Sequence, residues 1–270
     1  MIKLFNAEIY KFLKRRDNWL LFASIPILVF LSVHMFKKSN LSLERSNTGF
    51  VNSLNFPYQI IQEQLILAVN ILILYYVTNF IIQELKNGEA RFVFTRGVSK
   101  FQFIQSKIII ISLALLLFYI LIFIFSLLFG KLFLPYGNCI YKFFTEEKLV
   151  GLDAYKYAIK YYVIAYLSSL AMLMFLTLLG VFCKNSNIAF AVGLAVVIIS
   201  LIYPEIIAMI SASKVVFYIQ LTSIVFIQFK GIALFLSQPG FNIIIWICLI
   251  YIGLSLFLLM LFCKNRDYTY

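Results

Sequence analysis

The chain has 270 residues, of which 63% are hydrophobic and only 13% are charged. A soluble domain carries about 25% charged residues, so this composition cannot cover a water-facing surface. The net charge of +12 comes without a zinc-finger, helix-turn-helix or RNA-recognition pattern. Basic residues beside membrane helices explain it better than binding to nucleic acid does. The apolar runs are continuous and do not alternate, which favours spanning helices over a β-barrel.

Residues 1–18 have the pattern of a basic amphipathic helix. Apolar side chains repeat at helical spacing from Ile2 to Leu13, as in helices that lie in the membrane interface. Because the basic residues directly precede the first apolar run, this end is expected to be cytoplasmic. The basic residues that carry this prediction are Lys11, Lys14, Arg15 and Arg16.

The expected fold is an all-α polytopic membrane protein that forms one domain, residues 1–270. Its six transmembrane helices are expected at about residues 19–36, 60–82, 108–129, 161–182, 188–210 and 242–263. The first is expected to be retained, since it is long and lacks a small-residue cleavage site, and Pro26 is expected to kink it. Residues 211–240 are too polar for a span and too apolar for a free loop, which favours re-entrant or interfacial helices. Six spans place both termini in the cytoplasm, and the membrane is expected to be the bacterial cytoplasmic membrane.

Residues for catalysis do not come together in the sequence. There is one histidine, His34, no two cysteines form a CxxC pair, and no GxxxxGK[ST] phosphate loop occurs. The chain is therefore expected not to be an enzyme and to hold neither cofactor nor metal. Glu63 and Glu205 are the acidic residues near spans and are candidate translocation or gate residues, although a solvated helix end explains Glu63 equally well.

The stretch from Glu84 to Lys107 is the longest strongly charged run between two expected spans. A passive cytoplasmic loop would explain its charge, but the stretch is far longer than a hairpin requires. It mixes acids with bases, and Gly88 and Gly97 bracket a short apolar element. A short helix with aromatic anchors is a common docking mode, so we expect a soluble partner to bind here. The expected docking residues are Glu84, Gly88, Glu89, Arg91, Phe92, Phe94, Arg96, Gly97 and Lys100.

The N-terminal sequence NAEIYKFLKRRDNW, followed by a span, resembles the opening of ABC type-2 transporter permeases. The pattern Glu84-x3-Gly88-x7-Arg96-Gly97-x-Ser99-Lys100-x6-Lys107 is similar to the first cytoplasmic loop of that family. The chain departs from the family at Glu89, where Thr is frequent, and at Gly97, where Pro is frequent. The resemblance implies a coupling helix that docks on a separate ATP-binding subunit, which holds ATP and Mg. It also implies pairing with a second permease, either a copy or a paralogue.

The sequence thus predicts the transmembrane subunit of an ATP-driven exporter in the lipid bilayer. Its residue usage resembles that of low-GC Gram-positive bacteria, in which permeases of this family often export antimicrobial or cytolytic peptides. A hydrophobic or amphipathic cargo of that kind is therefore expected, on resemblance alone. The 29 Phe and 17 Tyr suit such a cargo but are explained at least as well by contact with lipid. Two alternatives stay open: a non-ABC channel or carrier, and a membrane immunity or sensor protein that binds a peptide without pumping it.

Overall fold

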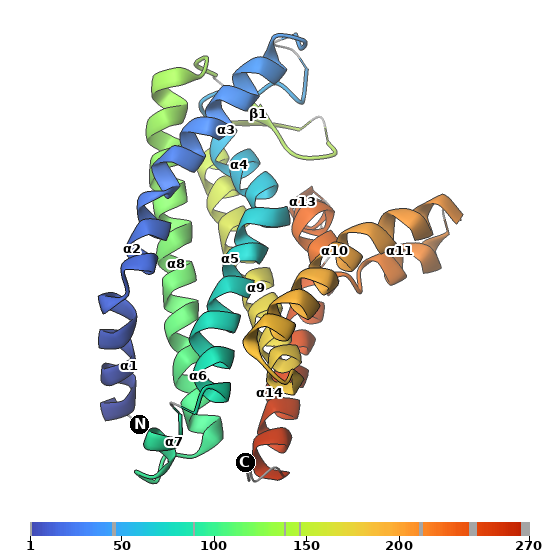
Figure 1. The fold of residues 1–270 in the computed structure, drawn as a ribbon. Helices are drawn as coiled ribbons and strands as arrows, with labels where there is room; N and C mark the ends of the chain where they lie inside the picture. Colours follow the sequence, from blue (N-terminus) through green and yellow to red (C-terminus); the bar gives the residue numbers. More distant parts are fainter. Residues whose placement is uncertain are drawn as a thin grey trace.

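A computed structural model describes residues 2–44, 47–88, 90–137, 139–145, 147–210, 213–237 and 242–265, which form an elongated helical bundle with one small hairpin (Figure 1). The helices are α1 (Ile2–Lys14), α2 (Arg16–Ala23), α3 (Ile25–Asn40), α4 (Phe56–Gln64), α5 (Asn70–Tyr76), α6 (Gln83–Lys86), α7 (Arg91–Phe94), α8 (Lys100–Phe133), α9 (Leu152–Phe182), α10 (Ser186–Ile210), α11 (Lys214–Gln220), α12 (Ile224–Phe226), α13 (Ile232–Ser237) and α14 (Ile243–Asn265). Three π-helical turns interrupt them: η1 (Leu65–Val69), η2 (Val77–Ile82) and η3 (Ile227–Gly231). The two strands, β1 (Cys139–Tyr141) and β2 (Lys148–Val150), pair antiparallel.

Six helical stretches of the described chain are long and apolar enough to cross a membrane, which confirms the predicted all-α polytopic membrane fold. They are Arg16–Asn40, Phe56–Lys86, Lys100–Phe133, Leu152–Phe182, Ser186–Ile210 and Ile243–Lys264. Several begin earlier than predicted, because polar residues continue the helix beyond its apolar part. At the start of α8, for example, the Ser99 side chain accepts a hydrogen bond from the Gln102 backbone, and the Gln102 side chain accepts one from the Ser99 backbone. This capping box fixes the start of the helix.

The N-terminal helix is shorter than predicted and is packed against the bundle. α1 ends at Lys14, and Arg15 is extended before α2 begins. The Asn18 side chain donates a 2.6 Å hydrogen bond to the Phe12 carbonyl, which satisfies a group that the end of α1 leaves without a helical partner. α1 runs beside the first part of α8 (Figure 1). Its location at a membrane interface stays a prediction.

Two irregular segments fall where the sequence predicted them. α2 and α3 meet at Ser24, and Pro26 lies in the first turn of α3; the kink expected at Pro26 stays a prediction. The region between α10 and α14 contains two short helical segments, Lys214–Gln220 and Ile224–Ser237, bent by 99° relative to each other. This pair is either a re-entrant loop or a broken seventh span, and the sequence predicted such a pair.

The two ends of the bundle differ. One end, here called the hairpin end, carries the link between α3 and α4 and the β1–β2 hairpin (Figure 1). The opposite end, here called the α7 end, carries α7 and the described residues nearest both termini (Figure 1). The sequence predicted a loop at residues 136–158 and missed the hairpin, because strands of three residues are too short to show alternation.

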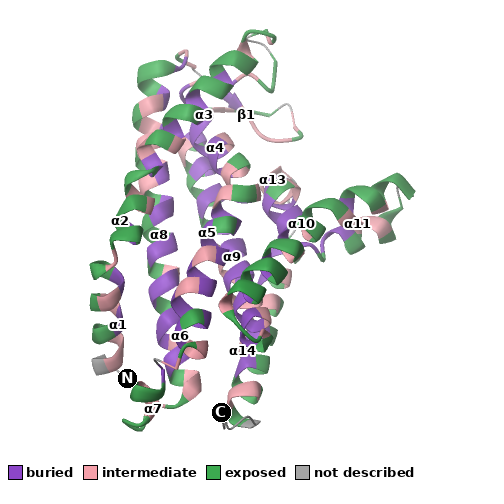
Figure 2. Cartoon of the chain, viewed as in Figure 1, coloured by how far each residue is buried: buried purple, intermediate pink, exposed green. Residues whose placement is uncertain are grey.

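Buried residues concentrate on the second and fourth spans (Figure 2). In these spans 67% and 61% of the most apolar window is buried, against 17% in α10. The outer half of α10 and the whole of α11 project sideways from the bundle (Figure 1) and are largely exposed (Figure 2). The second and fourth spans therefore form the centre of the bundle, and the other helices pack around them.

Candidate functional site

The predicted docking element is a single helical turn held between two glycines. Gly88 and Gly97 have φ angles of 81° and 79°, a left-handed conformation that glycine adopts at little cost and other residues rarely adopt. The turn between them, α7, spans Arg91–Phe94. Glu89, an expected docking residue, lies outside the described residues. The backbone therefore changes direction on each side of α7, as expected for a short element bracketed by glycines.

α7 turns one face inward and one face outward. Ala90, which precedes it, is buried, and the Phe94 ring packs edge-on against Phe103 of α8 at 5.6 Å between centroids. Phe92, in contrast, is 77% exposed. The expected docking residues that are exposed are Arg91, Phe92, Arg96 and Gly97, and those that are partly buried are Gly88, Phe94 and Lys100. The outward face thus combines an aromatic ring with arginine side chains.

Glu84 does not lie on this face. It was expected to contact a partner directly, but it is only 3% exposed. It belongs to a group of five charged residues from α1, its link to α2, α6 and α8, here called the charge cluster. The charge cluster consists of Glu8, Lys11, Arg15, Glu84 and Lys107. Glu84 therefore lies inside the bundle and does not form the outward face of α7.

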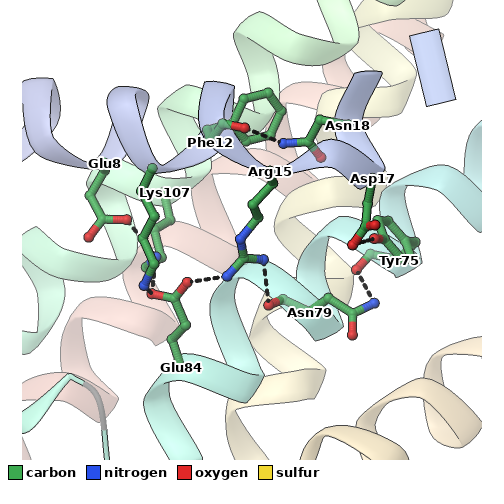
Figure 3. Close-up of polar contacts among 10 residues, drawn as sticks. Glu8, Phe12, Arg15, Asp17, Asn18, Tyr75, Asn79, Glu84 and Lys107 are labelled. Atoms are coloured by element: carbon green, nitrogen blue, oxygen red, sulfur yellow. Dashed lines mark hydrogen bonds and ion pairs between the residues drawn. The ribbon is translucent and has the colours of Figure 1, made fainter. Parts of the chain in front are cut away.

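Lys107 is the centre of the charge cluster. Its side chain is fully buried, and its Nζ donates to Glu8 Oε2 at 2.7 Å and to Glu84 Oε2 at 2.6 Å (Figure 3). The same ammonium lies 4.0 Å from the centroid of the Phe80 ring, within range of a cation–π interaction. Two carboxylates and an aromatic face thus compensate for the loss of water around one buried charge.

Two further basic residues neutralise Glu84. Arg15 Nη2 donates to Glu84 Oε1 at 2.7 Å (Figure 3), and Lys11 Nζ lies 2.9 Å from Glu84 Oε2. Arg15 also donates through Nη1 to the Asn79 carbonyl at 3.3 Å (Figure 3). The charge cluster therefore ties α1 and its link to α2 to the end of the second span and the start of the third.

Sequence reasoning placed part of this cluster elsewhere. Lys11 and Arg15 were predicted only as basic residues of an interfacial helix, and their contacts with Glu84 were not predicted. Lys14 and Arg16 are exposed. Glu8 was missed altogether. Its signal was available, because Glu8 falls on the apolar face of α1, between Phe5 and Phe12 at helical spacing, where an acid requires a partner.

The candidate gate residues are separate from each other in the described structure. Glu63 is exposed near the end of α4. Glu205 pairs with Lys230 at 2.7 Å, and both side chains are partly exposed. No described contact joins Glu63 to Glu205, and a role of either residue in translocation or gating stays a prediction.

A buried amide pair inside the bundle was not predicted. Asn70 Nδ2 donates to Gln228 Oε1 at 2.7 Å, and Gln228 Nε2 donates to Asn70 Oδ1 at 3.2 Å. Both side chains are fully buried. Asn70 directly follows η1 and Gln228 lies within η3, and these two turns pack against each other. The pair therefore links the second span to the bent helices before α14.

The fold and this site define a multi-pass helical membrane protein with a charged, helix-bearing end. Among the described residues no group of three or more His, Cys, Asp or Glu side chains could hold a metal ion. The chain belongs to the DUF2705 family, which is described as a protein of unknown function and whose family model matches residues 21–269. Comparison with curated proteins finds no match. The matched residues include α7, Glu84 and Lys107, whereas α1 precedes them.

Proposed function

We propose that this chain is the transmembrane subunit of an ATP-driven ABC exporter and that α7 docks on a separate ATP-binding subunit. The observation that carries the proposal is the single turn of α7, held between two left-handed glycines with Phe92 exposed. A short helix with an exposed aromatic anchor suits a groove on a partner. The resemblance of Glu84–Lys107 to the first cytoplasmic loop of ABC type-2 permeases supplies the identity of that partner.

The charge cluster gives the docking element a mechanical connection to the spans. The Ala90 amide donates to the Glu84 carbonyl at 3.3 Å, so α7 follows directly from the end of the second span. On its other side, Phe94 packs on Phe103 in the first turn of α8. Glu84 and Lys107 then join these two spans through a buried ion pair. A displacement of α7 is therefore passed to both spans and to α1 together.

In this proposal the α7 end faces the cytoplasm of a bacterial cell. The described residues nearest both termini lie at this end (Figure 1), and basic residues beside the first span favour the cytoplasmic side. ATP and Mg are bound by the partner subunit, and this chain supplies the moving helices. Two permeases, copies or paralogues, pair around the cargo. Antimicrobial or cytolytic peptides are proposed as that cargo on resemblance alone.

Co-purification of this chain from its native cells with a P-loop ATPase tests the proposal. The wild type is expected to elute with that ATPase and to change its rate of ATP hydrolysis. Phe92→Ala and Arg96→Glu are expected to weaken the complex at least ~10-fold, which corresponds to about 1.4 kcal/mol. Tyr136→Ala and Lys131→Glu, at exposed positions of the hairpin end, are the matched controls and should leave the complex intact. Absence of a complex, or equal loss in the control variants, would refute the proposal.

A further inference from the structure

A cavity of about 650 Å³ lies at the hairpin end, between α9, the hairpin, α13 and the start of α14. Its volume is within the range of roughly 300–1,000 Å³ that is typical of ligand pockets. Its lining is part charged and part apolar. The charged residues that line it are Lys142, Asp153, Lys156 and Lys160. The cavity is at the opposite end of the bundle from the charge cluster, so the proposed docking site does not account for it.

One face of α9 organises the cavity. Asp153, Lys156, Lys160, Val163 and Ile164 follow one another at helical spacing, and all of them line the cavity. Residues at such spacing share one face of a helix. This face changes from charged to apolar over about 15 Å, at 1.5 Å per residue. Since α9 is a candidate membrane span, the charged part lies toward its end and the apolar part lies deeper.

Positive charges outnumber negative charges around the cavity. Lys156 pairs with Asp153 at 3.3 Å, and Lys142 pairs with Glu147. Lys160 has no acidic partner in the described part of the chain, although it lies two turns into the helix. The charged part of the cavity is therefore positive. Below it the lining is apolar and includes Val163 and Phe235.

We propose that this cavity binds an anionic phospholipid, with the phosphate at Lys156 and Lys160 and an acyl chain along Val163, Ile164 and Phe235. Charge complementarity selects the headgroup, because a phosphate supplies an anionic partner for Lys160. A free anion would leave the apolar lining uncovered, and a neutral lipid would leave the excess lysine unpaired. The order of the two parts along α9 matches the order of headgroup and chain in a bilayer. The site does not rest on the proposed exporter function.

Native mass spectrometry of the purified protein tests this site. The protein is equilibrated with equal amounts of phosphatidylglycerol and phosphatidylcholine and then released from detergent. The wild type is expected to retain phosphatidylglycerol in preference. The double variant Lys156→Gln/Lys160→Gln is expected to lose that preference at least ~10-fold, which corresponds to about 1.4 kcal/mol. Lys38→Gln/Lys131→Gln removes the same charge from exposed positions of the hairpin end outside the cavity lining and should behave as the wild type.

A second variant and a competitor test the contributions of the acyl chain and the headgroup separately. Val163→Trp fills the apolar part from a position that is 63% exposed, so the fold should tolerate it, and both lysines remain. It is expected to reduce phosphatidylglycerol retention as the lysine variant does. Glycerol phosphate, which has the headgroup charge without the chains, is expected to compete poorly. Equal retention of both lipids by the wild type, equal loss in the control, or full competition by glycerol phosphate would overturn the proposal.

Discussion

At the scale of single residues, Lys107 carries the strongest prediction. Its ammonium is buried between Glu8 and Glu84, so Lys107→Met leaves two buried carboxylates without this partner. Removing one member of a buried ion pair costs about 3–5 kcal/mol. We expect a loss of that size in the free energy of unfolding in detergent. Lys131→Met, at an exposed position of the same helix, should change it by less than about 0.5 kcal/mol.

A rescue variant distinguishes charge from packing. If the cost of Lys107→Met comes from uncompensated carboxylates, then adding Glu8→Gln should restore part of the lost stability, because one buried charge is removed with its partner. Purely additive losses in the double variant would mean that the packing of the lysine side chain, and not its charge, stabilises this end of the bundle.

Residue identity alone did not predict the contacts of the charge cluster. The apolar face of α1 was evident from its spacing, and the same spacing places Glu8 within that face. The partner of Glu8 could not be predicted, because Lys107 is 99 positions away. A lysine that opens a span also looks the same in sequence whether it meets lipid, water or a carboxylate. Only the packing of α1 against α8 distinguishes these cases.

At the scale of elements, the glycines around α7 give a prediction that distinguishes the cost of a strained backbone from the cost of steric crowding. An added Cβ at Gly97 meets nothing within 4 Å, yet φ there is +79°. Gly97→Ala should therefore cost about 1–2 kcal/mol through the backbone alone. Gly253→Ala in α14, where nothing lies within 4 Å and no positive φ occurs, should be neutral or slightly stabilising. Unfolding measured for both variants in one detergent checks this, and equal effects would contradict it.

The amide pair between Asn70 and Gln228 is expected to couple two elements. Replacing either residue with leucine leaves the other partly unsatisfied in an apolar interior, at about 1–2 kcal/mol. Replacing both removes the buried polar groups together, so the double variant should lose less than the sum of the single losses. A double-mutant cycle on the free energy of unfolding measures this difference. Strict additivity would show that the two amides do not stabilise the contact of η1 with η3.

The short elements show where sequence patterns stop being informative. Gly88 and Gly97 marked the ends of α7 correctly, because each glycine permits a conformation that other residues avoid. The hairpin was missed, since three residues on each strand leave no periodicity to detect. The π-helical turns η1, η2 and η3 were not predicted either. They lie within apolar helical sequence, and tertiary packing distinguishes them from an α-helix.

At the scale of the whole molecule, the six spans followed from hydrophobicity, because backbone groups in lipid must be satisfied within each helix. Their arrangement did not follow. A uniformly apolar helix such as α14 has no distinct face from which its neighbours could be predicted. The sideways course of α10 and α11 depends on contacts between distant parts of the chain. The sequence therefore predicted the class of fold, and the structure was needed to locate the charge cluster.

The proposed orientation predicts a labelling pattern in intact cells. Ser42→Cys lies at the hairpin end, and Lys184→Cys lies between α9 and α10 at the α7 end, where Lys86 donates to the Val181 carbonyl at 3.4 Å. In a background with all four native cysteines changed to alanine, a membrane-impermeant maleimide should label only Ser42→Cys. Permeabilised cells should show labelling of both positions. Labelling of Lys184→Cys alone in intact cells would show that the orientation is the reverse of the proposed one.

The proposed function depends on α7 being a docking helix for an ATP-binding subunit. A photoactivatable benzophenone amino acid at position 92 tests it in living cells, with the same group at exposed Tyr136 of the hairpin end as the control. We predict a crosslinked adduct at position 92 that contains a P-loop ATPase and is absent at position 136. An adduct without such an ATPase, or the same adducts at both positions, would contradict the claim.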